Sequence, residues 1–304
     1  MVIDAHTHIG DLRSPAHGTL GRAPVSVDVL IQRLDDEGID RAVVLPWPAC
    51  PEAVEFPGLF DTTPDIVSQI RAAASRPDRL IPFGNADPRW GGNSPRADFS
   101  WLLERFVEMG CVGMGEVSAN IPFDDPRAVN LFRQCGAWRL PVTIESAGPG
   151  EGHYGFIDEV GAPHLERLLQ LAPDTIVIGH GPGFWADISS DLRDEDKSGY
   201  PAGPVKPGGA VPRLLRRYAN LCADISATSG LNALTRDAAF GIDFLIEFQD
   251  KLLFGTDVCF GDLEGRSQHL RWLRRLLAEG RIDQAVFDKI THQNALRLLA
   301  RLPS

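Results

Sequence analysis

The sequence lacks both a long hydrophobic run and an excess of positive charge. None of its segments approaches the roughly 18–20 consecutive apolar residues that a membrane-spanning helix needs. Its 30 basic residues are outnumbered by 41 acidic ones, which gives a formal net charge of −11. Because nucleic acids and anionic membranes attract basic surfaces, this balance disfavours both as partners. We therefore expect the partner to be a small-molecule substrate, with no nucleic acid and no membrane.

Cysteine pairs and a targeting segment are also missing. The five cysteines are odd in number and widely spaced, without a C-x-x-C motif. We expect them to be reduced and mostly buried, and we do not expect a cysteine-based zinc site. Cys259 stands out because it lies two residues beyond Asp257, a candidate site residue. The first residues form an apolar run rather than a signal peptide, so we expect a cytoplasmic protein.

What the chain does have is a regular alternation of apolar runs and helical patterns. Eight runs have the character of strands, at 1–7, 41–45, 80–86, 110–117, 141–146, 175–180, 220–226 and 252–257. Helical spacing occurs at 27–37, 63–75, 99–109, 126–139, 164–171, 210–218, 237–248 and 267–279. This order predicts an α/β fold, a single (β/α)₈ TIM barrel over residues 1–304, with extra C-terminal helices at 282–299. An open doubly wound sheet is disfavoured because no G-x-G-x-x-G turn follows the first run.

Two connections are longer than ordinary loops, at 11–24 and 185–209. Loops of this length in a compact domain are usually functional. Both follow a predicted strand, and the loops that follow barrel strands lie on the catalytic face. We therefore expect both segments near the active site.

Candidate metal ligands close several of the apolar runs. Asp4, His6 and His8 alternate in the first run, so they share one face of a strand. Imidazole and carboxylate groups also end the fourth, fifth, sixth and eighth runs, and Asp224 lies near the end of the seventh. Nitrogen and oxygen donors without thiolate suit zinc, manganese or iron. Since active sites of such barrels form at the C-terminal strand ends, we predict a divalent metal site there, built from His6, His8, Glu116, Glu145, His180 and Asp257.

The order of these motifs resembles a known superfamily. D-x-H-x-H at 4–8, I-G-H-G at 178–181, F-G-T-D at 254–257 and N-A-L-R-L-L at 294–299 are similar to motifs of the metal-dependent amidohydrolase superfamily. The similarity is to its amidohydrolase-related branch, which includes hydrolases and aminocarboxymuconate-semialdehyde decarboxylase-like enzymes. It covers essentially the whole chain. Barrels of this branch are often dimers, so a homodimer is an option that the resemblance implies.

The resemblance also implies roles for individual residues. His6, His8 and Asp257 would bind the metal, and Asp257 and His180 would be catalytic. Glu145 departs from the branch, which usually has a histidine there. We expect Glu145 to ligate nonetheless; the alternative is that it does not bind and that metal binding is weakened. Glu116 would either bridge two metals or orient a histidine, and we expect one ion rather than two, zinc first and manganese as the alternative.

The expected reaction is hydrolysis of a C–N or C–O bond in a small molecule by water that the metal activates. Asp257 would take a proton from the water, and His180 would stabilise the oxyanion or protonate the leaving group. His153, Trp185 and Arg89 are candidate substrate-binding residues. One alternative is metal-dependent, non-oxidative decarboxylation of a small carboxylic acid, for which Arg89 would hold the carboxylate. A second alternative is a metal-poor barrel with a binding role.

Overall fold

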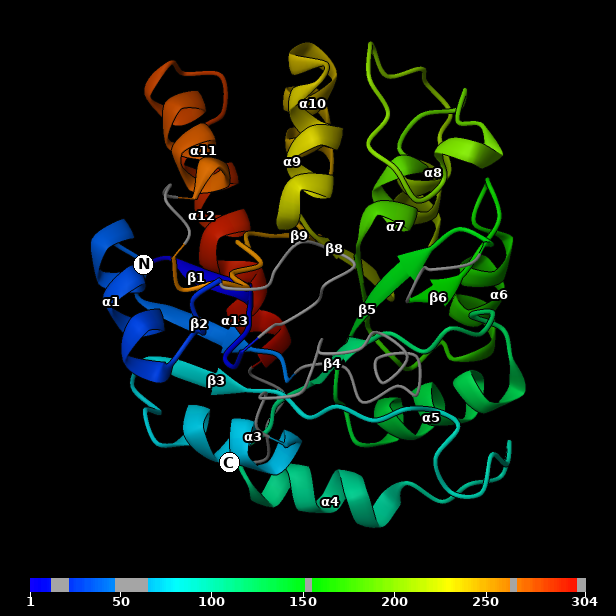
Figure 1. Ribbon diagram of the computed structural model, residues 1–304. Helices are drawn as coiled ribbons and strands as arrows, with labels where there is room; N and C mark the ends of the chain where they lie inside the picture. The colour runs from blue at the N-terminus through cyan, green and yellow to red at the C-terminus, as the bar shows by residue number, and fades with distance from the viewer. Residues whose placement is uncertain (12–21, 47–64, 151–154, 263–266, 300–304) are drawn as a thin grey trace.

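Eight parallel strands form a closed barrel with helices around it (Figure 1). The computed structural model describes residues 1–11, 22–46, 65–150, 155–262 and 267–299. The barrel strands, in order, are β1 Ile3–Thr7, β2 Arg41–Val44, β3 Leu80–Pro82, β4 Met114–Val117, β5 Val142–Ala147, β7 Val177–His180, β8 Leu221–Asp224 and β9 Leu252–Leu253. Each lies within a run predicted from the sequence, except that β5 extends one residue beyond its run, to Ala147. A further short strand, β6 Phe156–Ile157, pairs with the end of β5 and was not predicted.

Backbone hydrogen bonds close the barrel where the regular ladders are interrupted. Between β3 and β4, the Gly84 N–H donates to the carbonyl of Gly113 over 2.9 Å. At the seam between β9 and β1, the Ala5 N–H donates to Phe254 O and the Asp257 N–H donates to His6 O, both over 2.8 Å. The sheet is therefore continuous around the ring, and the chain's first and last strands are neighbours.

Most helices follow the predicted pattern within two or three residues. They are α1 Val27–Glu37, α3 Ile66–Ala74, α4 Ser100–Glu108, α5 Pro126–Ala137, α6 Pro163–Leu171, α8 Ala210–Arg217, α10 Ala238–Glu247 and α11 Gln268–Ala278. The first of them shows why: Ser26 accepts a hydrogen bond from the Val29 N–H as N-cap, and Gly38 ends the helix at a φ of 67°. A left-handed residue at that position favours glycine. Leu30, Ile31 and Leu34 form the buried face between these two signals.

Two helices appear where the sequence predicted none, α7 Pro182–Ala186 and α9 Ala227–Thr235. The predicted loop at 185–209 therefore begins inside a helix, and it also holds a 3₁₀ turn at Asp194–Asp196. Most of the predicted loop at 11–24 falls outside the described residues. The C-terminal helices are α12 Gln284–Asp288, a π-helical turn at Lys289–Gln293 and α13 Asn294–Leu299.

Apolar side chains fill one end of the barrel and leave the other end to polar groups. Ile3, Val43, Ile81 and Leu253 pack together inside the barrel, and Leu298 of α13 covers them. A second and larger cluster fills the space between the strands and the surrounding helices. The polar interior side chains therefore gather at the C-terminal strand ends. Among the helices of the described ranges, none is long and apolar enough to cross a membrane.

Candidate metal centre

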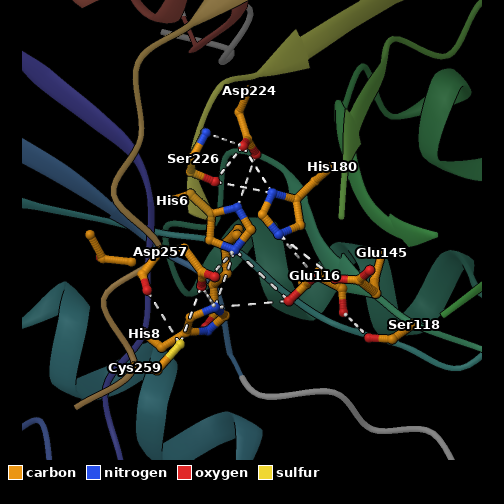
Figure 2. Close-up of polar contacts among 12 residues, drawn as sticks. His6, His8, Glu116, Ser118, Glu145, His180, Asp224, Ser226, Asp257 and Cys259 are labelled. Atoms are coloured by element: carbon orange, nitrogen blue, oxygen red, sulfur yellow. Dashed lines mark hydrogen bonds and ion pairs between the residues drawn. The ribbon is translucent and has the colours of Figure 1, made fainter. Parts of the chain in front are cut away.

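Six buried or half-buried polar side chains converge at the C-terminal ends of the strands (Figure 2). His6 lies on β1 and His8 directly after it, Glu116 lies on β4, Glu145 on β5 and His180 on β7. Asp257 follows β9, where its φ of 59° ends the extended backbone. β9 itself ends at Leu253, short of the run predicted at 252–257. The side chains expected from the sequence to form one site are thus in one place.

Three of them form a compact set of potential ligand atoms. His6 Nε2 and His8 Nε2 are 3.1 Å apart. Asp257 Oδ1 is 3.3 Å from His8 Nε2 and 3.7 Å from His6 Nε2. Two donors that each lie 2.0–2.2 Å from one ion are separated by about 2.8–3.6 Å at octahedral or tetrahedral angles. The separations of 3.1 Å and 3.3 Å lie inside this range and the one of 3.7 Å slightly exceeds it, so the set is close to what a divalent cation such as zinc or manganese needs.

Glu116 lies between these three residues and a second group, which consists of Glu145 and His180. Its Oε2 is 3.8 Å from the Nε2 atoms of both His6 and His8. Its Oε1 is 3.8 Å from His180 Nε2, and Glu145 Oε2 is 3.7 Å from the same nitrogen. Within the described residues, Glu116 Oε1 is buried without a hydrogen-bond partner. A buried carboxylate oxygen without a donor is costly unless a cation compensates it, so this oxygen also fits a metal site.

The imidazoles are held so that their Nε2 atoms face the centre. Asp224 at the end of β8 bridges two of them: its Oδ2 is 2.9 Å from His6 Nδ1 and its Oδ1 is 2.9 Å from His180 Nδ1. His8 Nδ1 is 2.9 Å from the carbonyl oxygen of Leu45. Carboxylate and carbonyl oxygens only accept, so each Nδ1 carries the proton. The Nε2 lone pairs of His6 and His8 are then free to bind a cation.

Asp224 is itself fixed by its neighbours. The Ser226 N–H donates to Asp224 Oδ1 over 3.1 Å, and the Ser226 hydroxyl donates to the same oxygen. The indole N–H of Trp185 donates to the backbone carbonyl oxygen of Asp224 over 3.0 Å. The sequence suggested Asp224 only as one polar residue at a strand end, and it gave no sign of Ser226.

Two glycines provide the room that Glu145 occupies. A Cβ built on Gly181 would lie 1.9 Å from Glu145 Oε1, and one built on Gly155 would lie 2.7 Å from Glu145 Cγ. Both glycines have positive φ, at 90° and 104°. Larger residues at these positions would displace the carboxylate from the centre.

The carboxyl groups differ strongly in acidity. Burial opposes ionisation of Asp257, but when His6 and His8 are protonated, in the absence of a metal, the hydrogen bond from His8 and the charges of both imidazoles lower the Asp257 pKa to about 2. Burial raises the pKa of Glu116 to about 8, and the Glu145 carboxylate adds to that rise. Burial also raises the pKa of Glu145 itself. Asp257 is therefore an anion at neutral pH, whereas Glu116 keeps its proton in part.

Metal-free protein is expected to lose stability as the pH rises from about 5 to 8. The Glu116 pKa is raised from 4.5 to about 8 on folding, so the folded state binds more protons in this window. The stabilisation is complete below pH 4.5 and is lost as the pH rises through 8, by up to a few kcal/mol. Thermal unfolding of chelator-treated wild type and Glu116→Gln will measure the effect. The variant should have the flatter pH dependence; parallel curves would contradict the assigned shift.

Comparison with known proteins gives the family. The model of an amidohydrolase family matches residues 3–301. The chain belongs to this amidohydrolase family. A search of curated protein sequences found no match.

Solved structures share the amidohydrolase barrel at low sequence identity. A zinc-bound amidohydrolase from Burkholderia multivorans is 16% identical with a TM-score of 0.64, and the match covers 100% of both chains. A manganese-bound dihydroxybenzoic acid decarboxylase from a Polaromonas species is 17% identical with a TM-score of 0.61, over 100% of this chain and 98% of that one. A probable 2-pyrone-4,6-dicarboxylic acid hydrolase from Acinetobacter baumannii is 16% identical with a TM-score of 0.58, over 98% and 99%. Both reaction types thus occur on similar folds.

The three candidate substrate-binding residues of this amidohydrolase differ in their placement. Trp185 is 1% exposed and packs against Phe184 and Phe244. It therefore contacts buried residues behind the metal centre and is not open to a substrate. Arg89 makes a two-point ion pair with Asp87, at 2.9 Å and 2.6 Å. His153 lies outside the described residues.

Other residues at the amidohydrolase site were given no role by the sequence. Asp4 shares the face of His6 but points to the seam, where it accepts hydrogen bonds from the Thr256 hydroxyl over 2.6 Å and from the Thr256 N–H over 3.0 Å. It thereby fixes the segment that carries Asp257. Burial raises the Asp4 pKa to about 7. Cys259 also faces the centre, with Sγ 3.3 Å from Asp257 Oδ1.

Proposed function

We propose that this protein is a metal-dependent hydrolase of a small-molecule C–N or C–O bond. The observation that carries the proposal is the position of Asp257. Its Oδ1 lies 3.3 Å from His8 Nε2 among the potential ligand atoms, and 22% of its side chain is exposed, against 0% and 1% for His6 and His8. An ionised carboxylate that solvent reaches at a metal centre is suited to take a proton from water.

The proposed metal site consists of His6, His8 and Asp257, with Glu145 and Glu116 as further donors. Their nitrogen and oxygen atoms suit zinc first and manganese second, and we propose one ion rather than two. A divalent cation bound there would acidify water and polarise a carbonyl group of the substrate. Asp257 would accept the proton that the water loses.

His180 is the proposed acid on the other side of the centre. Burial alone would lower the pKa of its imidazole, but the carboxylates of Asp224, Glu116 and Glu145 raise it well above the usual range. Asp224 holds the Nδ1 proton, so a second proton would lie on Nε2, which faces the centre. From there it can stabilise a developing oxyanion or protonate the leaving group.

The placement of Arg89 favours hydrolysis over decarboxylation. A decarboxylase must hold the carboxylate of its substrate, and Arg89, the arginine considered for that task, is paired with Asp87. A neutral ester, lactone or amide needs no such partner.

Metal analysis and a substrate panel test the proposal. We expect purified protein to contain a divalent metal, and metal-loaded enzyme to hydrolyse members of a panel of esters, lactones and amides. Asp257→Asn should lower turnover by about 10²–10⁴-fold, the usual contribution of a general base. Release of CO₂ from aromatic or unsaturated acids, without hydrolysis, would instead identify a decarboxylase. Protein that takes up no metal would identify a barrel with a binding role.

Glu145 gives a separate prediction about pH. A glutamate in place of the branch's histidine adds negative charge around the metal, which weakens its acidifying effect on water. We expect an alkaline activity optimum in the wild type and a shift of roughly one unit toward lower pH in Glu145→His. The pH profile of kcat/KM measures this. An unchanged profile in a folded, metal-loaded variant would show that Glu145 does not bind the metal.

A further inference from the structure

Cys259 is a thiol at the edge of the proposed metal centre. Its Sγ is 3.3 Å from both the backbone oxygen and Oδ1 of Asp257. The Sγ atom, a carboxylate oxygen of Asp257 and a ring nitrogen of His8 all lie within 4.8 Å of one another. Figure 2 shows the thiol on the same side of Asp257 as His8.

This separation fits two ligands of one ion. Sulfur binds zinc at about 2.3 Å and oxygen at about 2.0–2.2 Å, so the two atoms are about 3.0–3.7 Å apart at octahedral or tetrahedral angles. The observed 3.3 Å between Cys259 Sγ and Asp257 Oδ1 lies inside that range. Asp257 Oδ1 is also 3.3 Å from His8 Nε2. Asp257 Oδ1 thus lies at a distance from both the thiol and the imidazole that is expected between two ligands of the same ion.

The other described cysteines are placed differently. Cys111, Cys135 and Cys222 are buried at 0%, 0% and 4% exposure. Cys111 and Cys135 belong to the core around the barrel, and Cys222 to the apolar cluster inside it. Cys259 belongs to neither cluster and is half-buried. Packing explains those three residues, whereas the polar contacts of Cys259 are with a proposed metal ligand.

A second observation at the same centre points to a cation. Glu116 is 4% exposed, and its Oε1 has no hydrogen-bond partner among the described residues. Its Oε2 faces His8, which is also the neighbour of Cys259. The group around His8 therefore offers nitrogen, oxygen and sulfur donors together.

We propose that Cys259 is a metal-binding residue that joins His8 and Asp257 in holding a divalent cation of borderline softness, such as Zn²⁺ or Co²⁺. The inference rests on the proposed metal-dependent function and adds a thiolate to its donor set. On binding, a metal–sulfur bond forms as the S–H bond breaks, and the proton passes to solvent. A thiolate favours zinc over the harder manganese. The proposal differs from the expectation, drawn from cysteine spacing, that the chain has no cysteine-based zinc site.

Cobalt absorption of the full chain tests the proposal. Co²⁺ added to chelator-treated wild type should give visible d–d bands and a near-ultraviolet thiolate-to-cobalt charge-transfer band. Cys259→Ser should lose the charge-transfer band and keep the d–d bands, because the histidines and Asp257 still bind. Cys222→Ala, at a buried cysteine outside the centre, is the matched control and should keep both.

The outcomes separate the two proposals. Bound cobalt without a charge-transfer band in wild type, or a band that persists in Cys259→Ser, would overturn the thiolate ligand and leave the metal centre intact. Failure of folded protein to bind cobalt at all would overturn both. Alkylation followed by peptide mass spectrometry gives an independent measure: Zn²⁺ should slow labelling of Cys259 by about tenfold or more, because a metal-bound thiolate is less available as a nucleophile. Equal labelling with and without bound Zn²⁺ would also overturn the ligand.

Discussion

Replacing His8 with alanine is expected to abolish both metal retention and turnover. His8 Nε2 lies 3.1 Å from His6 Nε2 and 3.3 Å from Asp257 Oδ1, in the middle of the proposed ligand set. Alanine removes one of the two imidazoles and leaves the buried acid groups without part of their compensating charge. Elemental analysis after dialysis, together with turnover of the best substrate from the panel, measures the effect.

The matched control is His292→Ala. This histidine lies in the π-helical turn Lys289–Gln293 and is not among the residues whose ligand atoms converge at the centre. The control should retain its metal and its activity, which would separate a loss at the centre from a general effect of removing a histidine. Full activity in His8→Ala, or in wild type freed of metal, would rule out the proposed mechanism.

Asp224→Asn is expected to weaken metal binding by about 10–100-fold, the usual effect of losing a partner that orients a metal-binding histidine. The carboxylate accepts hydrogen bonds from both His6 Nδ1 and His180 Nδ1. An amide of the same shape accepts at one atom only and presents N–H groups at the other. One imidazole must then turn or change tautomer, which would place a proton on the nitrogen that faces the metal.

Metal titration and the pH profile of kcat/KM distinguish this effect from simple loss of structure. Ser226→Ala is the control, because it removes one hydroxyl donor from Asp224 and leaves the carboxylate in place. We expect it to change metal affinity by less than about tenfold. A folded Asp224→Asn protein with wild-type metal affinity would show that Asp224 does not set the histidine tautomers.

The sequence predicted the barrel well because its strands and most helices carry strong local patterns. α1, for example, has a capping serine, a buried stripe and a terminal glycine. α9 was missed because Ala227–Thr235 contains two threonines, a serine, a glycine and an asparagine, which have low helix propensity. Its Ser229 and Gly230 are buried, so tertiary packing must stabilise a helix that its sequence does not favour.

The sequence could predict which residues lie at the site, because they follow barrel strands, but not how their side chains pair. The rule that catalytic groups follow barrel strands gathered His6, Glu116 and Asp257 correctly in one place. It could not show that Asp224 is shared by two histidines from different strands, because such pairing depends on the barrel's closure. Nor could it show that Arg89 turns to Asp87, since both residues follow the same strand and either direction suits the pattern.

The seam between β9 and β1 links metal binding to the order in which the chain is made. Asp4 and Thr256, which hydrogen-bond across this seam, are 252 residues apart in sequence. His6 and His8 precede Asp257 in the chain, so they are synthesised well before it. A cation held by all three therefore binds only after the last strand has been synthesised and docked, and it ties the two ends of the ring together. The metal would then bind late in folding, and it would close a stretch of about 250 residues at the entropic cost that a loop of this length carries.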